Sequence, residues 1–225
     1  VHYPGPNQVL LYAATNVGVL RYTSNDPWAA TSTAIQWQQL KSGRIADMVV
    51  SPTDHSTVFA SVVGDGVYRT TMGATISGER HWTKLVGLPA INDETGQWYT
   101  LDIYREDPKI VYAALTNPYG KSGQSPYKLG IFQSLDGGTK KWQLVRGYKD
   151  ADGLGVLYNP FVRVHPKNSQ LIYFGGVKLY KENLASPSWH PERVDGIHDD
   201  MQELFFDPTD ESGDTYYVTN DGGIW

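Results

Sequence analysis

The sequence of 225 residues contains no cysteine. A disulfide framework, thiolate chemistry and a cysteine-ligated metal are therefore excluded. The absence fits an extracellular chain and a cytosolic chain equally well, so cysteine usage does not decide the compartment.

Basic clusters and long apolar runs are also absent. The net charge is −5, and basic residues gather nowhere beyond Lys140-Lys141, which argues against nucleic acid as a partner. No run approaches the roughly 18 apolar residues that a membrane span requires. The chain begins at Val1 without a signal-peptide pattern, so we expect a processed, trimmed or partial chain.

The chain is rich in aromatic residues and turn formers, with 15 Tyr and 7 Trp beside 23 Gly and 13 Pro. Tyr and Trp favour strands, whereas Gly and Pro favour the tight turns between them. Helical spacing of apolar residues is weak, and Gly and Pro interrupt every candidate helix. The composition therefore predicts an all-β protein and excludes helical solenoids.

A short strand with a central aromatic residue recurs at intervals of roughly 45 to 60 residues. Its copies are LLYAAT (10–15), TVFASV (57–62), IVYAAL (110–115), LIYFGG (171–176) and TYYVTN (215–220). A second marker keeps step with it, at Trp37, Trp82, Trp142 and Trp189. Four short strands per unit of about 45 residues are typical of a β-propeller blade. We predict a propeller of four-stranded antiparallel blades, with repeat units 1–40, 41–88, 89–146, 147–193 and 194–225.

The ends of the chain bear on the number of blades. Counting strands from the centre outward, we expect the chain to open on the second strand of one blade. It should stop at NDGGIW (220–225), the start of a third strand. About four to five blades could close as a five-bladed ring or form a segment of a seven- or eight-bladed propeller. The expected lack of an innermost strand in the first blade favours the segment.

One turn resembles a known motif. SLDGGTKKW (134–142) resembles the Asp-box of bacterial-neuraminidase (BNR) repeats, with one extra residue before Trp142, and TTMGATISGERHW (70–82) is a weaker copy with Met72 in place of Asp. With the other repeats, these turns make the chain similar to BNR, sortilin-like and YVTN-like propellers. That group includes sialidases and xyloglucan-cleaving glycoside hydrolases. The resemblance implies the fold and a secreted or periplasmic location, and leaves the chemistry open.

The resemblance also implies which loops surround the central channel, and it places Asp136 on the opposite face in a structural role. The candidate ligand-binding residues on the channel face are Trp98, Tyr99, Tyr119, Tyr127, Tyr158, Arg44 and His198. Aromatic rings beside carboxylates suit sugars, because rings stack on apolar sugar faces and carboxylates accept hydroxyl hydrogen bonds. The alternative is that these rings fill the spaces between blades.

Two functions remain open. The first is non-catalytic binding of a glycan or protein on the channel face. The second is a xyloglucanase- or sialidase-like glycoside hydrolase that uses paired carboxylates, for which Asp200 and Asp221 are the candidates. The resemblance puts Asn16 and Asn220 where a catalytic Asp would stand, and Arg44 with Arg163 is too small a set for a sialidase arginine cluster. We therefore favour binding.

The segment GIHDDMQELFFDP (196–208) raises the question of a metal. Successive strand residues point to opposite faces, so His198 and Asp200 would converge while Asp199 points away. They are the candidate metal ligands, with Ca²⁺ possible although no cofactor is required. The alternative is the polar entrance of an ordinary strand. The oligomeric state stays open.

Overall fold

The computed structural model describes residues 2–5, 8–24, 36–91, 97–116, 129–149, 160–188 and 190–225. Within these ranges the chain is all-β, apart from one 3₁₀ turn, η1 (Glu79–His81). No helix of the described residues is long and apolar enough to cross a membrane.

Five antiparallel sheets form the blades of a five-bladed β-propeller, and each sheet follows chain order from its innermost to its outermost strand. Blade 1 consists of β1 (His2–Gly5), β2 (Gln8–Ala14), β3 (Gly18–Ser24) and β4 (Gln38–Ser42). Blade 2 consists of β5 (Ile45–Val50), β6 (Val58–Val62), β7 (Gly66–Thr70) and β8 (Thr83–Lys84). Blade 3 consists of β9 (Thr100–Ile103), β10 (Val111–Thr116), β11 (Leu129–Ser134) and β12 (Gln143–Tyr148). Blade 4 consists of β13 (Phe161–His165), β14 (Asn168–Gly175), β15 (Tyr180–Asn183) and β16 (Glu192–Arg193). Blade 5 consists of β17 (Met201–Phe206), β18 (Tyr216–Asn220) and β19 (Gly223–Ile224).

The recurring aromatic strand of the sequence is the second strand of each blade. In blades 2 and 3 this strand is buried on both faces, as in Val58–Val62 of β6 and Val111–Leu115 of β10. A strand packed between two neighbouring blades has no solvent face, which explains its continuous apolar run in place of an alternating one.

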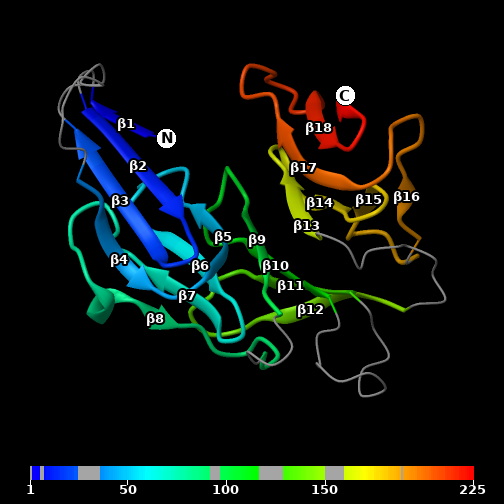
Figure 1. Cartoon of the computed structure of the whole chain (residues 1–225). Helices are drawn as coiled ribbons and strands as arrows, with labels where there is room; N and C mark the ends of the chain where they lie inside the picture. Colours follow the sequence, from blue (N-terminus) through cyan, green and yellow to red (C-terminus); the bar gives the residue numbers. More distant parts are fainter. Residues whose placement is uncertain are drawn as a thin grey trace.

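Successive blades pack against each other along an arc. Contacts run from β2 to β5, and then through the innermost strands from β5 to β9, β9 to β13 and β13 to β17. Figure 1 shows the blades following one another from blue to red, with blades 1 and 5 at the two ends of the arc. Among the described residues, no strands of these two end blades contact each other to a similar extent.

Blade 1 corrects one expectation. It does have an innermost strand, because β1 pairs with β2 through His2 opposite Leu10 and Gly5 opposite Gln8. The sequence signal failed because β1 is four residues long and contains Pro4 and Gly5, which are disfavoured in strands. The chain therefore opens on the first strand of a blade, while its last blade does end at a third strand. The unit boundaries stay a prediction, and Trp189 lies outside the described residues.

The turn between β11 and β12 is held by its own side chains. The Ser134 hydroxyl accepts the N–H of Gly138 at 2.9 Å, and the Asp136 carboxylate accepts the N–H of Thr139 at 3.0 Å. Although burial opposes it, the hydrogen bond from Ser134 and those from the backbone of the turn lower the pKa of Asp136. Trp142 is buried against blade 2 beneath the turn. Asp136 therefore caps the turn, which is a structural role.

Replacing Gly138 by alanine is expected to destabilise the protein by about 2–4 kcal/mol. Gly138 has a φ of +76°, and an added Cβ would lie 2.9 Å from Leu85 Cδ1 and 3.1 Å from Trp142 Cζ2. Gly196 is the matched control, since its φ is +85° and nothing lies within 4 Å of an added Cβ. Gly196→Ala should cost only the backbone strain, about 1–2 kcal/mol, in urea unfolding. Equal losses at the two sites would show that the space around Gly138 is not restrictive.

Candidate functional site

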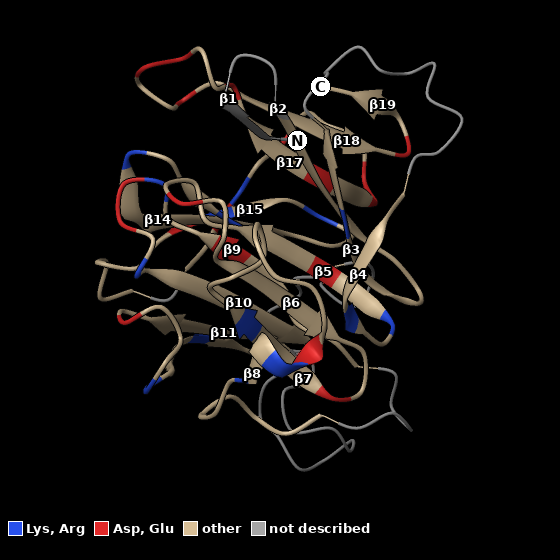
Figure 2. Ribbon diagram, turned by 90° about the vertical axis from the view of Figure 1, so that its left-hand side faces the viewer, with Lys and Arg blue, Asp and Glu red and all other residues tan. Residues whose placement is uncertain are grey.

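Four of the five innermost strands carry a charged residue within an otherwise apolar run. These residues are Asp47 on β5, Asp102 on β9, Arg163 on β13 and Glu203 on β17. Figure 2 shows acidic positions within each of β5, β9 and β17. Because innermost strands line the centre of a propeller, these four residues form one cluster, which we call the channel cluster.

The two aspartates of the channel cluster connect neighbouring blades. Asp47 Oδ2 accepts the backbone N–H of Leu101 on β9 at 2.7 Å, and Asp102 Oδ2 accepts the N–H of Val164 on β13 at 2.7 Å. The same contact is thus made from blade 2 to blade 3 and from blade 3 to blade 4. Each aspartate satisfies an N–H group of an innermost strand that has no further strand on that side to pair with.

Arg163 is the cation of the channel cluster. Its Nη2 donates to Glu203 Oε2 at 2.6 Å, and its Nη1 donates to the carbonyl of Leu101 at 3.1 Å. Burial by itself would lower the pKa of Arg163, but the charges of Asp102, Glu203 and Asp47 outweigh it and raise the pKa. The guanidinium therefore holds three blades together through one side chain.

Both aspartates of the channel cluster have raised pKa values. Burial raises the pKa of Asp102 to about 6, against the opposing effects of Arg163 and of the hydrogen bond from Val164. Burial raises the pKa of Asp47 in the same direction. Both aspartates are thus more easily protonated than an exposed aspartate.

A groove of about 390 Å³ runs along the inner strands of blades 3 to 5 beside the channel cluster. Its charged lining residues are Asp102, Arg105, Arg163 and Glu203. The Phe205 ring also lines it and is 51% exposed, whereas the neighbouring Leu204 is buried. Strand alternation explains the difference, because Phe205 shares the face of Glu203 while Leu204 turns to the core.

The histidine and aspartates before β17 lie outside the strand. β17 begins at Met201, and Asp200 has a φ of +61°, so strand alternation does not apply to His198 and Asp200. The backbone N–H of Asp200 donates to Val177 O at 2.8 Å, and Asp199 forms an ion pair with Lys178. The predicted convergence of His198 and Asp200 assumed that both residues lie within a strand, but β17 begins after them.

The His198 segment is instead packed on the turn after β18. A Cβ added to Gly222 would lie 2.6 Å from His198 Cβ, and the Asn220 amide donates to His198 O at 3.0 Å. Asp221 is exposed and accepts a hydrogen bond from the Gln202 side chain at 3.2 Å. Asn220 is therefore a turn-forming residue that holds this corner of blade 5.

The metal hypothesis gains no support from the described part of the chain. Within it, no group of three or more His, Asp or Glu side chains is arranged to hold an ion. The pair His198 and Asp200 remains a prediction, as does a catalytic role for Asp200 and Asp221.

The predicted ligand-binding residues differ in burial, and some of them lie outside the described part of the chain. Tyr99 is a correction, because its ring is 0% exposed and its hydroxyl donates to Pro89 O at 2.6 Å, so it belongs to the core. Trp98 is half-buried and Arg44 is exposed. The other predicted residues, Tyr119, Tyr127 and Tyr158, lie outside the described residues.

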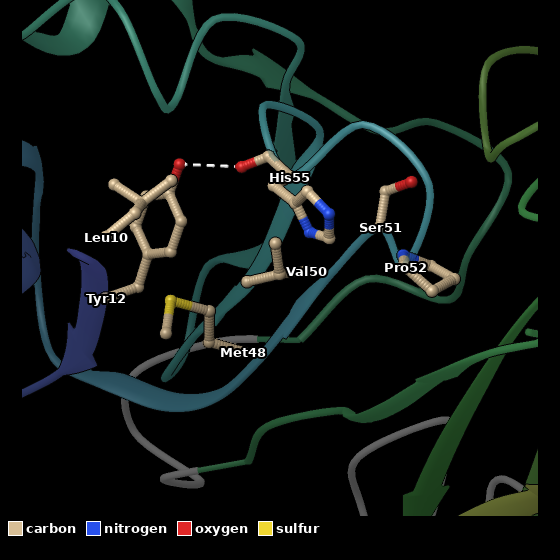
Figure 3. Close-up of a pocket in the computed structure, with 7 residues that line it drawn as sticks. All are labelled: Leu10, Tyr12, Met48, Val50, Ser51, Pro52 and His55. Carbon is tan, nitrogen blue, oxygen red and sulfur yellow. Dashed lines mark hydrogen bonds between the residues drawn. The ribbon is translucent and has the colours of Figure 1, made fainter. Parts of the chain in front are cut away.

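A smaller cavity of about 260 Å³ lies between blades 1 and 2. Figure 3 shows its lining, which is mostly apolar, with the Tyr12 hydroxyl donating to the carbonyl of His55 at 2.8 Å. This bond joins β2 to the turn after β5. The cavity contains no ion pair between its lining residues, which distinguishes it from the groove at the channel cluster.

Fold and geometry together define an all-β propeller whose centre is lined by charged side chains. No protein-family model matches the sequence, and no curated protein matches it. Among solved structures, the chain is similar to a GH74 enzyme of Niastella koreensis, with a TM-score of 0.56 and 14% identity over 97% of this chain and 34% of that one. A GH74 xyloglucanase from Xanthomonas campestris has a TM-score of 0.40 and 13% identity over 82% of this chain and 36% of that one. The chain spans about a third of the length of each, and the first likeness shows the fold alone.

Sequence reasoning missed Asp102 and underrated Arg163 and Glu203. The available signal was a charged residue inside the apolar segment that precedes each aromatic strand, as in IADMVV (45–50) and FVRVH (161–165). A charge within a buried strand is uncommon without a partner. Its recurrence in four units would have indicated a cluster at the centre.

Proposed function

We propose that the protein is a non-catalytic carbohydrate-binding propeller whose ligand lies in the groove at the channel cluster. The observation that carries the proposal is the exposed Phe205 ring beside the Arg163–Glu203 ion pair in one groove. An aromatic face can stack on the apolar side of a sugar ring, while a carboxylate and a guanidinium form hydrogen bonds with its hydroxyls.

The engagement of the aspartates supports binding over hydrolysis. Each of Asp47 and Asp102 accepts a backbone N–H of the neighbouring blade, so each has one oxygen committed to the scaffold. Glu203 is held by Arg163. Side chains that are fixed in this way provide a preorganised set of hydrogen-bonding groups, which lowers the entropic cost of binding a flexible sugar.

Phe205→Ala should weaken binding of a neutral oligosaccharide by about tenfold, because the stacking surface is lost. The probes are cellohexaose, a xyloglucan oligosaccharide and a mannan oligosaccharide, titrated calorimetrically. Tyr217→Ala is the control: Tyr217 is 42% exposed on the adjacent strand and does not line the groove. Equal affinity of the Phe205→Ala variant and the wild type, or no binding to any probe, would refute the proposal.

A second candidate function is glycoside hydrolysis, which the raised pKa of Asp102 favours. With a pKa of about 6 and a place in the same groove as Glu203, Asp102 has the property of a general acid with a second carboxylate nearby. Reducing-sugar release from the same oligosaccharides distinguishes the two functions. Release that Asp102→Asn abolishes would establish hydrolysis, and its absence in the presence of binding leaves the binding function.

Two further parts of the proposal rest on the resemblance described in the sequence analysis. They are that the repeats are BNR or Asp-box repeats and that the protein is secreted or periplasmic. Ca²⁺ is an accessory ligand of the His198 and Asp200 segment in this proposal and is not required for sugar binding. Calorimetry with Ca²⁺ checks that part separately.

A further inference from the structure

A second polar pocket lies away from the channel, where the outer strands of blade 2 meet the turn between β11 and β12. Its volume is about 350 Å³. Its basic lining residues are Arg69, His81 and Lys84. Hydroxyl groups come from Thr71, Thr83 and Thr139. No carboxylate of the described chain lines it.

Arg69 is the distinctive group of this pocket. Its Nε is buried and has no hydrogen-bond partner among the described residues. Its guanidinium lies over the Phe59 ring at 5.7 Å, a contact that uses the face of the group and leaves its N–H edge uncommitted. The Arg69 side chain as a whole is only partly buried, but a buried N–H group without an acceptor is costly, so a ligand that accepts from this edge would be stabilised.

The other blades show what this position normally does. Opposite the recurring aromatic residue, the third strands of blades 1, 2, 3 and 4 carry Arg21, Arg69, Gln133 and Lys181. Gln133 donates to the Tyr112 hydroxyl, and Lys181 pairs with Glu192 at 3.2 Å. Arg69 differs from Gln133 and Lys181 in that its Nε atom is buried without a partner, a feature that it shares with Arg21.

Arg21 gives the closest comparison. Its Nη1 donates to the carbonyl of Gly73, in the following blade's turn, at 2.7 Å, and its Nη2 donates to Gln38 Oε1 at 2.5 Å. Arg69 approaches the equivalent turn, since a Cβ added to Gly137 would lie 3.9 Å from Arg69 Nη2, but it makes no hydrogen bond there. The blade 2 arginine is therefore placed like its counterpart and left with its donors free for another acceptor.

The neighbouring groups suit an anion. Lys84 lines the pocket while paired with Asp65 at 2.5 Å, so its charge is partly compensated and Arg69 supplies the main uncompensated charge. Thr83 is exposed, whereas the Thr139 hydroxyl already donates its one hydrogen to Asp136 O at 3.0 Å and has none left for an anion. Guanidinium and hydroxyl donors around one cavity are the usual set for an oxyanion.

We propose that the pocket at Arg69 binds a tetrahedral oxyanion, either as free sulfate or phosphate or as the sulfate or phosphate ester of a sugar. This site is separate from the groove at the channel cluster and does not depend on the function proposed for that groove. The guanidinium binds two oxygens side by side, and the Thr83 hydroxyl donates to a third.

The test is calorimetric titration of the whole chain with inorganic sulfate, inorganic phosphate, galactose 6-sulfate and galactose, at constant ionic strength. We expect the first three to bind and galactose to fail. Arg69→Gln, which installs the residue of the equivalent position in blade 3, should weaken binding by about tenfold or more. Thr83→Val should weaken it by about threefold. The control Lys181→Gln removes one positive charge elsewhere and should bind like the wild type.

The outcomes distinguish a sugar ester from a free anion as the ligand, and they also show when the proposal is wrong. Tighter binding of the ester than of free sulfate assigns the site to a modified sugar, and equal binding assigns it to the free anion. If Arg69→Gln does not fold, Thr83→Val and Lys181→Gln still decide the matter. No heat with any anion, or equal affinity in wild type and Thr83→Val together with a loss in Lys181→Gln, would overturn the proposal.

Discussion

Glu182→Ala is expected to lower the free energy of unfolding by about 3–5 kcal/mol, more than the loss expected for Gly138→Ala. Arg146 on β12 and Glu182 on β15 form an ion pair between blades 3 and 4, and their side chains are only 7% and 2% exposed. Arg146 also donates to the carbonyls of Leu184 and Ser186, both at 3.2 Å. Removal of the carboxylate leaves a buried guanidinium without its counter-charge.

The size of this loss comes from desolvation and not from the attraction alone. Burial raises the pKa of Glu182 in spite of Arg146, which shows that the site is unfavourable for an isolated charge. Glu182→Gln keeps an acceptor for Arg146 and should cost less than Glu182→Ala.

The matched control is in the same blade. Glu192 pairs with Lys181 at 3.2 Å, but the Lys and Glu side chains are 38% and 69% exposed. Glu192→Ala should therefore cost about 0–1 kcal/mol. Urea unfolding followed by circular dichroism measures both variants. Similar losses for Glu182→Ala and Glu192→Ala would contradict the prediction that burial makes the Arg146–Glu182 pair costly to break.

The second large effect is a pH dependence that originates at Asp102. Its pKa is about 6 in the folded protein and 3.8 as an ordinary aspartate. Between these values the folded state keeps a proton that the unfolded state has lost, so this residue makes stability fall as pH rises from about 4 to about 6. A shift of about two pKa units corresponds to about 3 kcal/mol.

Asp102→Asn should remove this pH dependence. At pH 4 the wild-type residue is protonated and resembles asparagine, so the two proteins should be equally stable. Above pH 6.5 the wild type carries a buried charge, and the variant should be more stable by up to about 3 kcal/mol. Other carboxylates with lowered pKa values, such as Asp54 and Asp65, act with the opposite sign. They cancel in the difference between variant and wild type.

Asp102→Ala serves as the comparison. It removes the acceptor of the Val164 N–H and should be less stable than Asp102→Asn by about 1–3 kcal/mol at every pH. Thermal unfolding from pH 4 to pH 8 measures all three proteins. If Asp102→Asn proved less stable than the wild type above pH 6.5, attraction to Arg163 would outweigh the cost of burial.

The fold could be predicted because its signals are local and repeated. Aromatic strands such as β6 and β10 are buried between blades, so their sequence pattern survives in every unit. β1 could not be predicted in this way, since it is short, contains Pro4 and Gly5, and is defined by pairing with β2.

The candidate site was harder to predict because it depends on neighbours far apart in sequence. Burial raises the pKa of Asp102, while Val164 and Arg163 on the next blade contact it and oppose that shift, and no local pattern records this proximity. Tyr99 failed for the same reason: its loop position suggested exposure, while tertiary packing buries it completely. For His198 and Asp200 only the assumed strand geometry was wrong, because β17 begins at Met201 and sequence patterns locate strand boundaries poorly.

The arc of blades has a thermodynamic consequence. Among the described residues, the main strand contacts between blades join each blade to the one before or after it, so this part of the chain resembles a one-dimensional array. Its total stability is then a sum of contributions from single blades and from the junctions between them. A defect at the junction of blades 3 and 4 is felt there and adds independently to a defect at the junction of blades 1 and 2.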